Sequence, residues 1–164
     1  MATATYDLIA TATLSSSGTI TFNSIPSTYT DLRVVCVATT TSTTNFWMQF
    51  NSDSGTNYSV TYLGGDGSSV SSLTETNTTS VRATLGNTST TIPGLWTFDI
   101  FSYASSVYKT VLSSENTDRN GSGYSAREVN CWRSTSAINS ITLLPNTGSF
   151  ASGTTATLYG IKAA

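Results

Sequence analysis

Histidine is absent from the 164 residues of this sequence. The chain therefore lacks the commonest general base, the usual partner of a catalytic serine or cysteine, and the commonest metal ligand. Its two cysteines, Cys36 and Cys131, form no Cys-x-x-Cys pair and give no zinc-site spacing. Each lies in an apolar run, and we expect free thiols rather than a disulfide because the N-terminal residues form no export signal. We expect no catalytic site, no metal and no cofactor.

Charge is also scarce. Only 10% of the residues are Asp, Glu, Lys or Arg, and the formal net charge is −2, whereas roughly 25% of the residues in an ordinary soluble domain are charged. There is no block of Lys or Arg, so a phosphate backbone or an anionic lipid surface would find little to bind. No apolar run reaches the ~18 residues of a membrane-spanning helix. We expect neither nucleic acid nor a membrane as partner.

Serine and threonine take the place of charge and make up roughly a third of the residues. Helix surfaces are normally built from Glu, Lys, Arg and Gln, whereas Thr favours strands and Ser, Gly and Asn favour turns. Apolar and polar residues also alternate over short segments, for example at Phe46, Met48 and Phe50. Together these features predict an all-β protein.

The spacing of the strand-like segments predicts one β-sandwich domain over residues 1–164. Eight to ten short antiparallel strands fit two packed four-stranded sheets, and a jelly-roll-like arrangement is the first choice. We expect residues 46–50 and the strand that starts at Tyr58 to form a hairpin. Residues 64–80 are too polar for a core strand, and we expect an exposed loop or a loosely ordered excursion. Residues 1–7 form either an N-terminal arm that adds to a neighbour's sheet or simply the start of the first strand.

The acidic residues are scattered, and most lie in turn-like contexts. Asp99, between aromatic residues in WTFDIF, is the exception, and we expect it to be partly buried and paired with an arginine such as Arg133. The oxygen-rich loop at residues 51–57 lacks the further carboxylates of a calcium loop, which favours a cluster of Asx turns. A polysaccharide hydrolase that uses Asp99 or Glu128 stays open, since acids and aromatic residues are both present.

Aromatic residues on a weakly charged surface are typical of sites that stack on sugars or pack against other proteins. Some of the aromatic residues must instead fill the core. The candidate protein-interface residues are Tyr6, Trp47, Tyr103, Tyr108, Tyr124 and Trp132.

Three stretches carry a resemblance to a known family. They are FNSIPSTYTDLRVV near the start, MQFNSDSGTNYSVTYLGG in the middle and STSAINSITLLPNTGSFASGTTATLYGIKAA at the end. In this order they resemble small virion surface proteins of tailed bacteriophages, notably cyanophages, and the likeness covers most of the chain.

The resemblance implies a β-rich structural protein without enzymatic activity, either a capsid decoration (cement) protein on the outside of a phage head or a module of a tail fibre or tail appendage that binds a host receptor glycan. We expect the decoration protein, because the chain begins at a methionine and carries no heptads or repetitive stalk. The expected partners are the major capsid protein and the chain itself, as a dimer or trimer. The expected location is the virion, on the capsid surface, after synthesis in the host cytoplasm. A carbohydrate-binding module outside any virion is a third interpretation.

Overall fold

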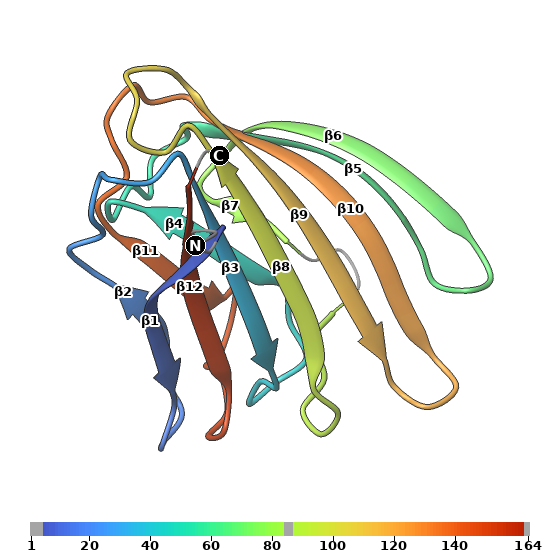
Figure 1. Ribbon diagram of the computed structural model, residues 1–164. Coiled ribbons are helices and arrows are strands. Elements are labelled where there is room, and N and C mark those ends of the chain that lie inside the picture. The colour runs from blue at the N-terminus through green and yellow to red at the C-terminus, as the bar shows by residue number, and fades with distance from the viewer. Residues whose placement is uncertain (1–4, 84–86, 163–164) are drawn as a thin grey trace.

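The computed structural model describes residues 5–83 and 87–162, and these residues form β-strands and no helix (Figure 1). The strands are β1 (Tyr6–Thr13), β2 (Ile20–Phe22), β3 (Asp31–Ala38), β4 (Phe46–Phe50), β5 (Tyr58–Gly65), β6 (Val70–Thr78), β7 (Val81–Arg82), β8 (Gly94–Phe101), β9 (Lys109–Asp118), β10 (Gly123–Trp132), β11 (Ile141–Pro145) and β12 (Thr155–Ile161). The prediction of an all-β fold is confirmed, with more strands than the eight to ten expected. Within the described ranges, no helix is long and apolar enough to span a bilayer.

The strands form two sheets in which every neighbouring pair is antiparallel. The large sheet has eight strands in the order β1-β12-β3-β8-β9-β10-β5-β6, and the small sheet has four in the order β2-β11-β4-β7. The two sheets pack face to face as a β-sandwich. The expectation of two equal four-stranded sheets is wrong, because the β5–β6 and β9–β10 hairpins both extend the same sheet. In Figure 1 these four strands curve away on the right, beyond the small sheet.

The core forms because side chains alternate between the two faces of each strand. Leu32, Val34 and Cys36 of β3 point inward, and Phe46 of β4 meets them from the small sheet; all four are fully buried. The ring of Phe46 lies 5.1 Å, centroid to centroid, from that of Trp96. Each such large apolar side chain contributes about 1.5–3 kcal/mol on burial, so the alternating residues supply the main favourable term in folding.

Two local predictions are wrong. β4 and β5 form no hairpin, because β4 pairs with β11 and β7 in the small sheet whereas β5 pairs with β10 and β6 in the large one. Asn51 and Ser52, with φ of 51° and 58°, turn the chain from one sheet to the other. Residues 64–80 contain an ordered strand, β6, which is polar because it lies at the sheet edge with little to bury.

The two ends of the described chain lie side by side in the large sheet. β1 pairs with β12, which in turn pairs with β3, so the last strand lies inside the sheet. Tyr6 and Asp7 pair with Ile161 and Gly160. Part of the expected N-terminal arm therefore belongs to the chain's own sheet, while residues 1–4 lie outside the described residues. At Gly160 the ring of Tyr29 packs directly on the backbone, and an added Cβ would clash with it.

Candidate protein-interaction surface

The large sheet turns one face to the small sheet and the other to solvent. We call the second side the outer face. On each strand, every second side chain points away from the core. The register of the strands places these side chains next to one another across the sheet. The residues of the outer face include Tyr6, Leu8, Thr11, Thr13, Arg33, Val35, Val37, Thr61, Leu63, Leu95, Thr97, Asp99, Phe101, Leu112, Ser114, Arg127, Val129, Thr155, Thr157 and Tyr159.

Apolar side chains on the outer face are unusually accessible. Leu8, Leu63 and Val129 are 63%, 59% and 50% exposed, and they are spread over β1, β5 and β10. Phe101 of β8 is 40% exposed. Several large apolar side chains exposed on one face of a sheet are a feature of surfaces that contact another protein.

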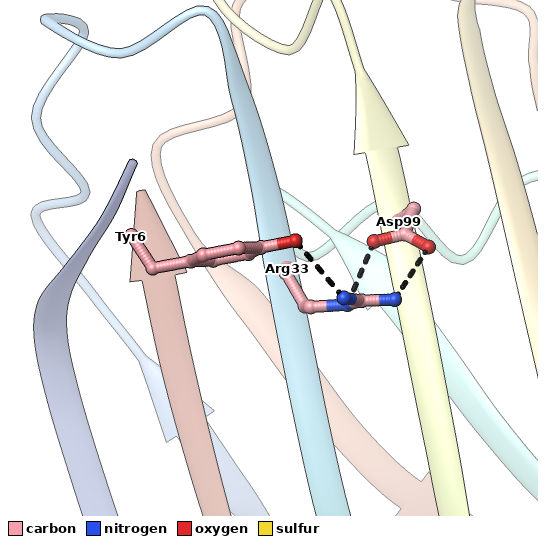
Figure 2. Close-up of polar contacts among 3 residues, drawn as sticks. All are labelled: Tyr6, Arg33 and Asp99. Carbon is pink, nitrogen blue, oxygen red and sulfur yellow. Dashed lines mark hydrogen bonds and ion pairs between the residues drawn. The ribbon is translucent and has the colours of Figure 1, made fainter. Parts of the chain in front are cut away.

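The charged residues near the centre of the outer face neutralise one another, as Figure 2 shows. Arg33 of β3 lies directly opposite Asp99 of β8. Its Nε is 2.9 Å from Asp99 Oδ1, one terminal guanidinium nitrogen donates to Oδ2 at 3.1 Å, and the other donates to the Tyr6 hydroxyl at 3.1 Å. Both carboxylate oxygens of Asp99 are thus held by the guanidinium group in a bidentate pair. The expected partner Arg133 is wrong: it lies at the end of β10 and donates to the Thr56 carbonyl.

Hydroxyl groups occupy most of the remaining outer face. Thr11 lies opposite Thr157, with 3.4 Å between the side-chain oxygens, and Thr61 lies opposite Thr74, with 3.1 Å. Paired hydroxyls satisfy one another and carry no formal charge. These hydroxyl pairs keep the face polar enough for water, yet they lose little solvation energy when a partner covers them, because they carry no charge.

Four of the six candidate interface residues reach the surface. Tyr6 and Tyr108 are exposed, at 47% and 58%. Trp47 is half-buried on the small sheet, with a guanidinium group of β7 5.0 Å above its ring. Tyr124 is half-buried on β10, where its hydroxyl lies 2.9 Å from that of Ser71 on β6. Only Tyr6 lies on the outer face, so the structure does not gather the four into one site.

Tyr103 and Trp132 are wrong as interface candidates, because they are 0% and 2% exposed. Each has an internal partner for its polar tip, as a buried Tyr or Trp requires. The Tyr103 hydroxyl donates to the Pro26 carbonyl and accepts from the Tyr29 backbone N–H. The Trp132 indole N–H donates to Asp53 Oδ2 at 2.7 Å.

The oxygen-rich loop after β4 is held by hydrogen bonds. Asp53 accepts from the Gly55 backbone N–H, the Asn57 amide and the Trp132 indole N–H. Burial acts to raise the pKa of Asp53, but these hydrogen bonds outweigh it and the pKa is lowered. Both carboxylate oxygens thus face N–H donors, as the Asx-turn interpretation predicted. Among the described residues no group of three His, Cys, Asp or Glu side chains is placed to hold a metal ion.

Glu128 lies on the opposite side of the sheet from Asp99, packed into the sandwich. It is fully buried on β10, facing Ser113 of β9, and Glu115, two residues beyond Ser113 on the same face of β9, is also fully buried. Burial raises the pKa of Glu128 to about 7, and the Ser113 hydroxyl and the charge of Arg127 offset this only in part. Asp99 and Glu128 therefore cannot converge on one substrate, and neither Glu128 nor Glu115 reaches solvent.

Sequence patterns gave no indication of Lys109. Its side chain is buried beneath the loop between β8 and β9, where Nζ donates to the carbonyl oxygens of Ser105, Val107 and Ser134. Desolvation lowers its pKa. The exposed apolar residues of the outer face were also missed, since alternation cannot tell which side of a strand is covered. Both cysteines are free thiols, as predicted.

Comparisons with protein-family models, with curated proteins and with solved structures found no match to this chain.

Proposed function

We propose that the protein is a structural component of a phage virion, a capsid decoration protein that binds the outer surface of the head and stabilises it by protein–protein contacts. The observation that carries the proposal is the outer face: a broad sheet surface with exposed apolar residues, satisfied hydroxyl pairs and a self-neutralised Arg33–Asp99 pair. Such a surface suits association with proteins rather than with ions or nucleic acid. In this proposal the partners are the major capsid protein and further copies of the chain.

Strand connectivity supports the same proposal. Eight strands switch between the sheets along the chain at every step except from β4 to β7, which both lie in the small sheet, and they form the matching orders β1-β12-β3-β8 and β2-β11-β4-β7. We infer from this order a jelly roll of two interlocked Greek keys, with the β5–β6 and β9–β10 hairpins as insertions. Jelly rolls occur in viral capsid proteins and in lectins, but a fold alone does not assign a function. The order is therefore secondary support.

The weak charge of the surface fits repeated binding on a shell. Copies placed on adjacent symmetric sites repel one another little when each carries a net charge of only −2. Each copy then adds a modest contact energy to the shell. Because the copies bind the assembled shell, their combined binding shifts the equilibrium between free subunits and shell toward the shell.

Copy number in purified particles tests the location. Quantitative mass spectrometry of the virion should find on the order of hundreds of copies, as symmetric head sites require. A handful of copies would place the protein on the tail, and its absence from particles would refute a virion role. Heads that lack the protein should also lose resistance to heat.

A pair of variants tests the face. Val129→Asp places a charge on the outer face, on β10, whereas Val107→Asp changes an equally exposed residue in the loop between β8 and β9. We expect Val129→Asp to abolish binding to heads, because the new carboxylate must be desolvated, while Val107→Asp binds normally. Equal binding by both variants would exclude the outer face as the contact.

A second candidate function, binding of a receptor glycan by a tail appendage, is favoured by a hollow between the tips of the β5–β6 and β9–β10 hairpins. Its lining includes Asp66, Asp118 and Tyr124 together with glycines and serines. Carboxylates beside an aromatic ring can bind sugar hydroxyls and stack on a sugar face. Binding of host surface glycan that is lost in Asp118→Asn, with head binding absent, would favour this alternative.

A further inference from the structure

The large sheet ends at β6, and this edge is open. Among the residues that the structure describes, β6 pairs with β5 alone. Figure 1 shows the β5–β6 hairpin standing at the far end of the curved sheet. Val70 is 79% exposed and Leu73 is 41% exposed, so the strand is accessible on its faces as well as along its edge.

The hairpin register decides which backbone groups face the open side. The Asp66 N–H donates to the Ser69 carbonyl at 3.2 Å and closes the turn. Hydrogen-bonded and non-hydrogen-bonded pairs alternate from there. Leu73 therefore exchanges bonds with Tyr62, whereas Ser72 and Thr74 direct their N–H and C=O groups away from β5. Within residues 5–83 and 87–162, no strand pairs with this edge.

The other sheet edges are protected where β6 is not. β2 and β7 have three and two residues. β1 carries a bulge between Leu8 and Ala10 and lies beside the Lys162–Asp7 ion pair. β6 has nine residues, no proline and no lysine or arginine, and its register is regular from Val70 to Thr76. Natural proteins normally shield such an edge because it recruits another strand.

We propose that β6 pairs with β6 of a second copy of this chain, antiparallel about a two-fold axis, and joins the two large sheets into one. The strand is suited to itself because its one charge, Glu75, already contacts Arg82 at 3.4 Å. Since the proposal concerns the isolated chain, it does not rest on the function proposed above.

Several antiparallel registers join residues whose backbone groups face the open side, but only the one centred on Leu73 pairs the whole regular segment from Val70 to Thr76 with itself. In this register the hydrogen-bonded pairs join Ser72 with Thr74 of the second copy and Thr74 with its Ser72. Leu73 then lies opposite its own counterpart on the axis, in a non-hydrogen-bonded pair where side chains are closest. Glu75 faces Ser71 of the second copy, and the two Glu75 carboxylates stand about 13 Å apart along the strand direction, which avoids repulsion.

Variants at Thr74 test the pairing. We expect light scattering after size exclusion to give the wild type twice the 17.3 kDa chain mass at high concentration, with dissociation on dilution. Thr74→Pro removes an edge-facing N–H without removing a β5–β6 bond, and it should be monomeric. Thr74→Val keeps the N–H and should remain dimeric. An unchanged near-ultraviolet circular dichroism spectrum in Thr74→Pro shows that the fold is kept.

A cysteine at the axis tests the register. Leu73→Cys should cross-link the two copies under mild oxidation, whereas Leu63→Cys, which is more accessible but one strand further in, should not. A wild type that is monomeric at every concentration, a dimer that persists in Thr74→Pro, or a dimer without the Leu73→Cys cross-link would each overturn the proposal.

Discussion

Raising the pH should destabilise the protein through Glu128. The side chain is fully buried, and its pKa in the folded protein is about 7, raised from 4.5 by burial. Below about pH 4.5 the carboxyl is protonated in both folded and unfolded chains, so burial then carries no charge penalty. Between about pH 4.5 and pH 7 the folded protein holds a proton that the unfolded chain has already released. Above about pH 7 the folded protein must bury the charged carboxylate. Stability therefore falls between about pH 4.5 and pH 7.

The magnitude follows from the difference of about 2.5 pKa units, which corresponds to about 3 kcal/mol. No histidine titrates over the same window, because the chain has none. Glu128→Gln removes the titrating group, so its free energy of unfolding should lose most of the fall between about pH 5 and pH 8. The buried amide itself costs about 1–3 kcal/mol if unsatisfied, and the slope with pH is therefore the quantity to compare.

Urea unfolding followed by tryptophan fluorescence at successive pH values measures the slope. Glu75→Gln is the matched control, because it removes a half-exposed carboxylate at the sheet edge and should leave the fall in place. A wild type whose stability is constant over the window, or a Glu128→Gln protein that keeps the full slope, would refute the reasoning.

Three further substitutions test the packing. Lys109→Met strips three backbone carbonyl oxygens of their shared donor and should cost about 1–3 kcal/mol in denaturant unfolding. Asp53→Ala should cost a similar amount through loss of the Trp132 indole bond, and added calcium should not shift the wild-type melting temperature. Gly160→Ala should cost about 1–3 kcal/mol by overpacking against the ring of Tyr29. Unchanged unfolding midpoints, or a calcium-induced rise for the wild type, would contradict these expectations.

The outcome at the aromatic residues shows where sequence patterns stop being informative. Trp132 stands beside a charged residue just as Tyr6 and Tyr108 do, yet Trp132 is buried, as is Tyr103, whereas Tyr6 and Tyr108 are exposed. The difference depends on whether a distant segment supplies a hydrogen-bond partner, as Asp53 does for Trp132 across the loop after β4. Sequence spacing contains no information about such a partner.

The fold class followed from the sequence because it depends on local preference. A chain rich in Thr and Ser, poor in charge and alternating in short apolar runs favours strands joined by turns wherever it folds. The free thiols and the Asx turns around Asp53 also depended on neighbours close in sequence or on composition.

Only the tertiary structure decided which strands share a sheet, and with it the outer face. The residues that would form a β4–β5 hairpin instead pass between the sheets, and the hairpins β5–β6 and β9–β10 both extend the large one. That assignment brings Arg33 rather than Arg133 to Asp99, separates Asp99 from Glu128, and leaves β6 as an open edge. Strand pairing is a choice among distant segments with similar local preferences, so it is fixed by core packing and backbone hydrogen bonding over the whole chain.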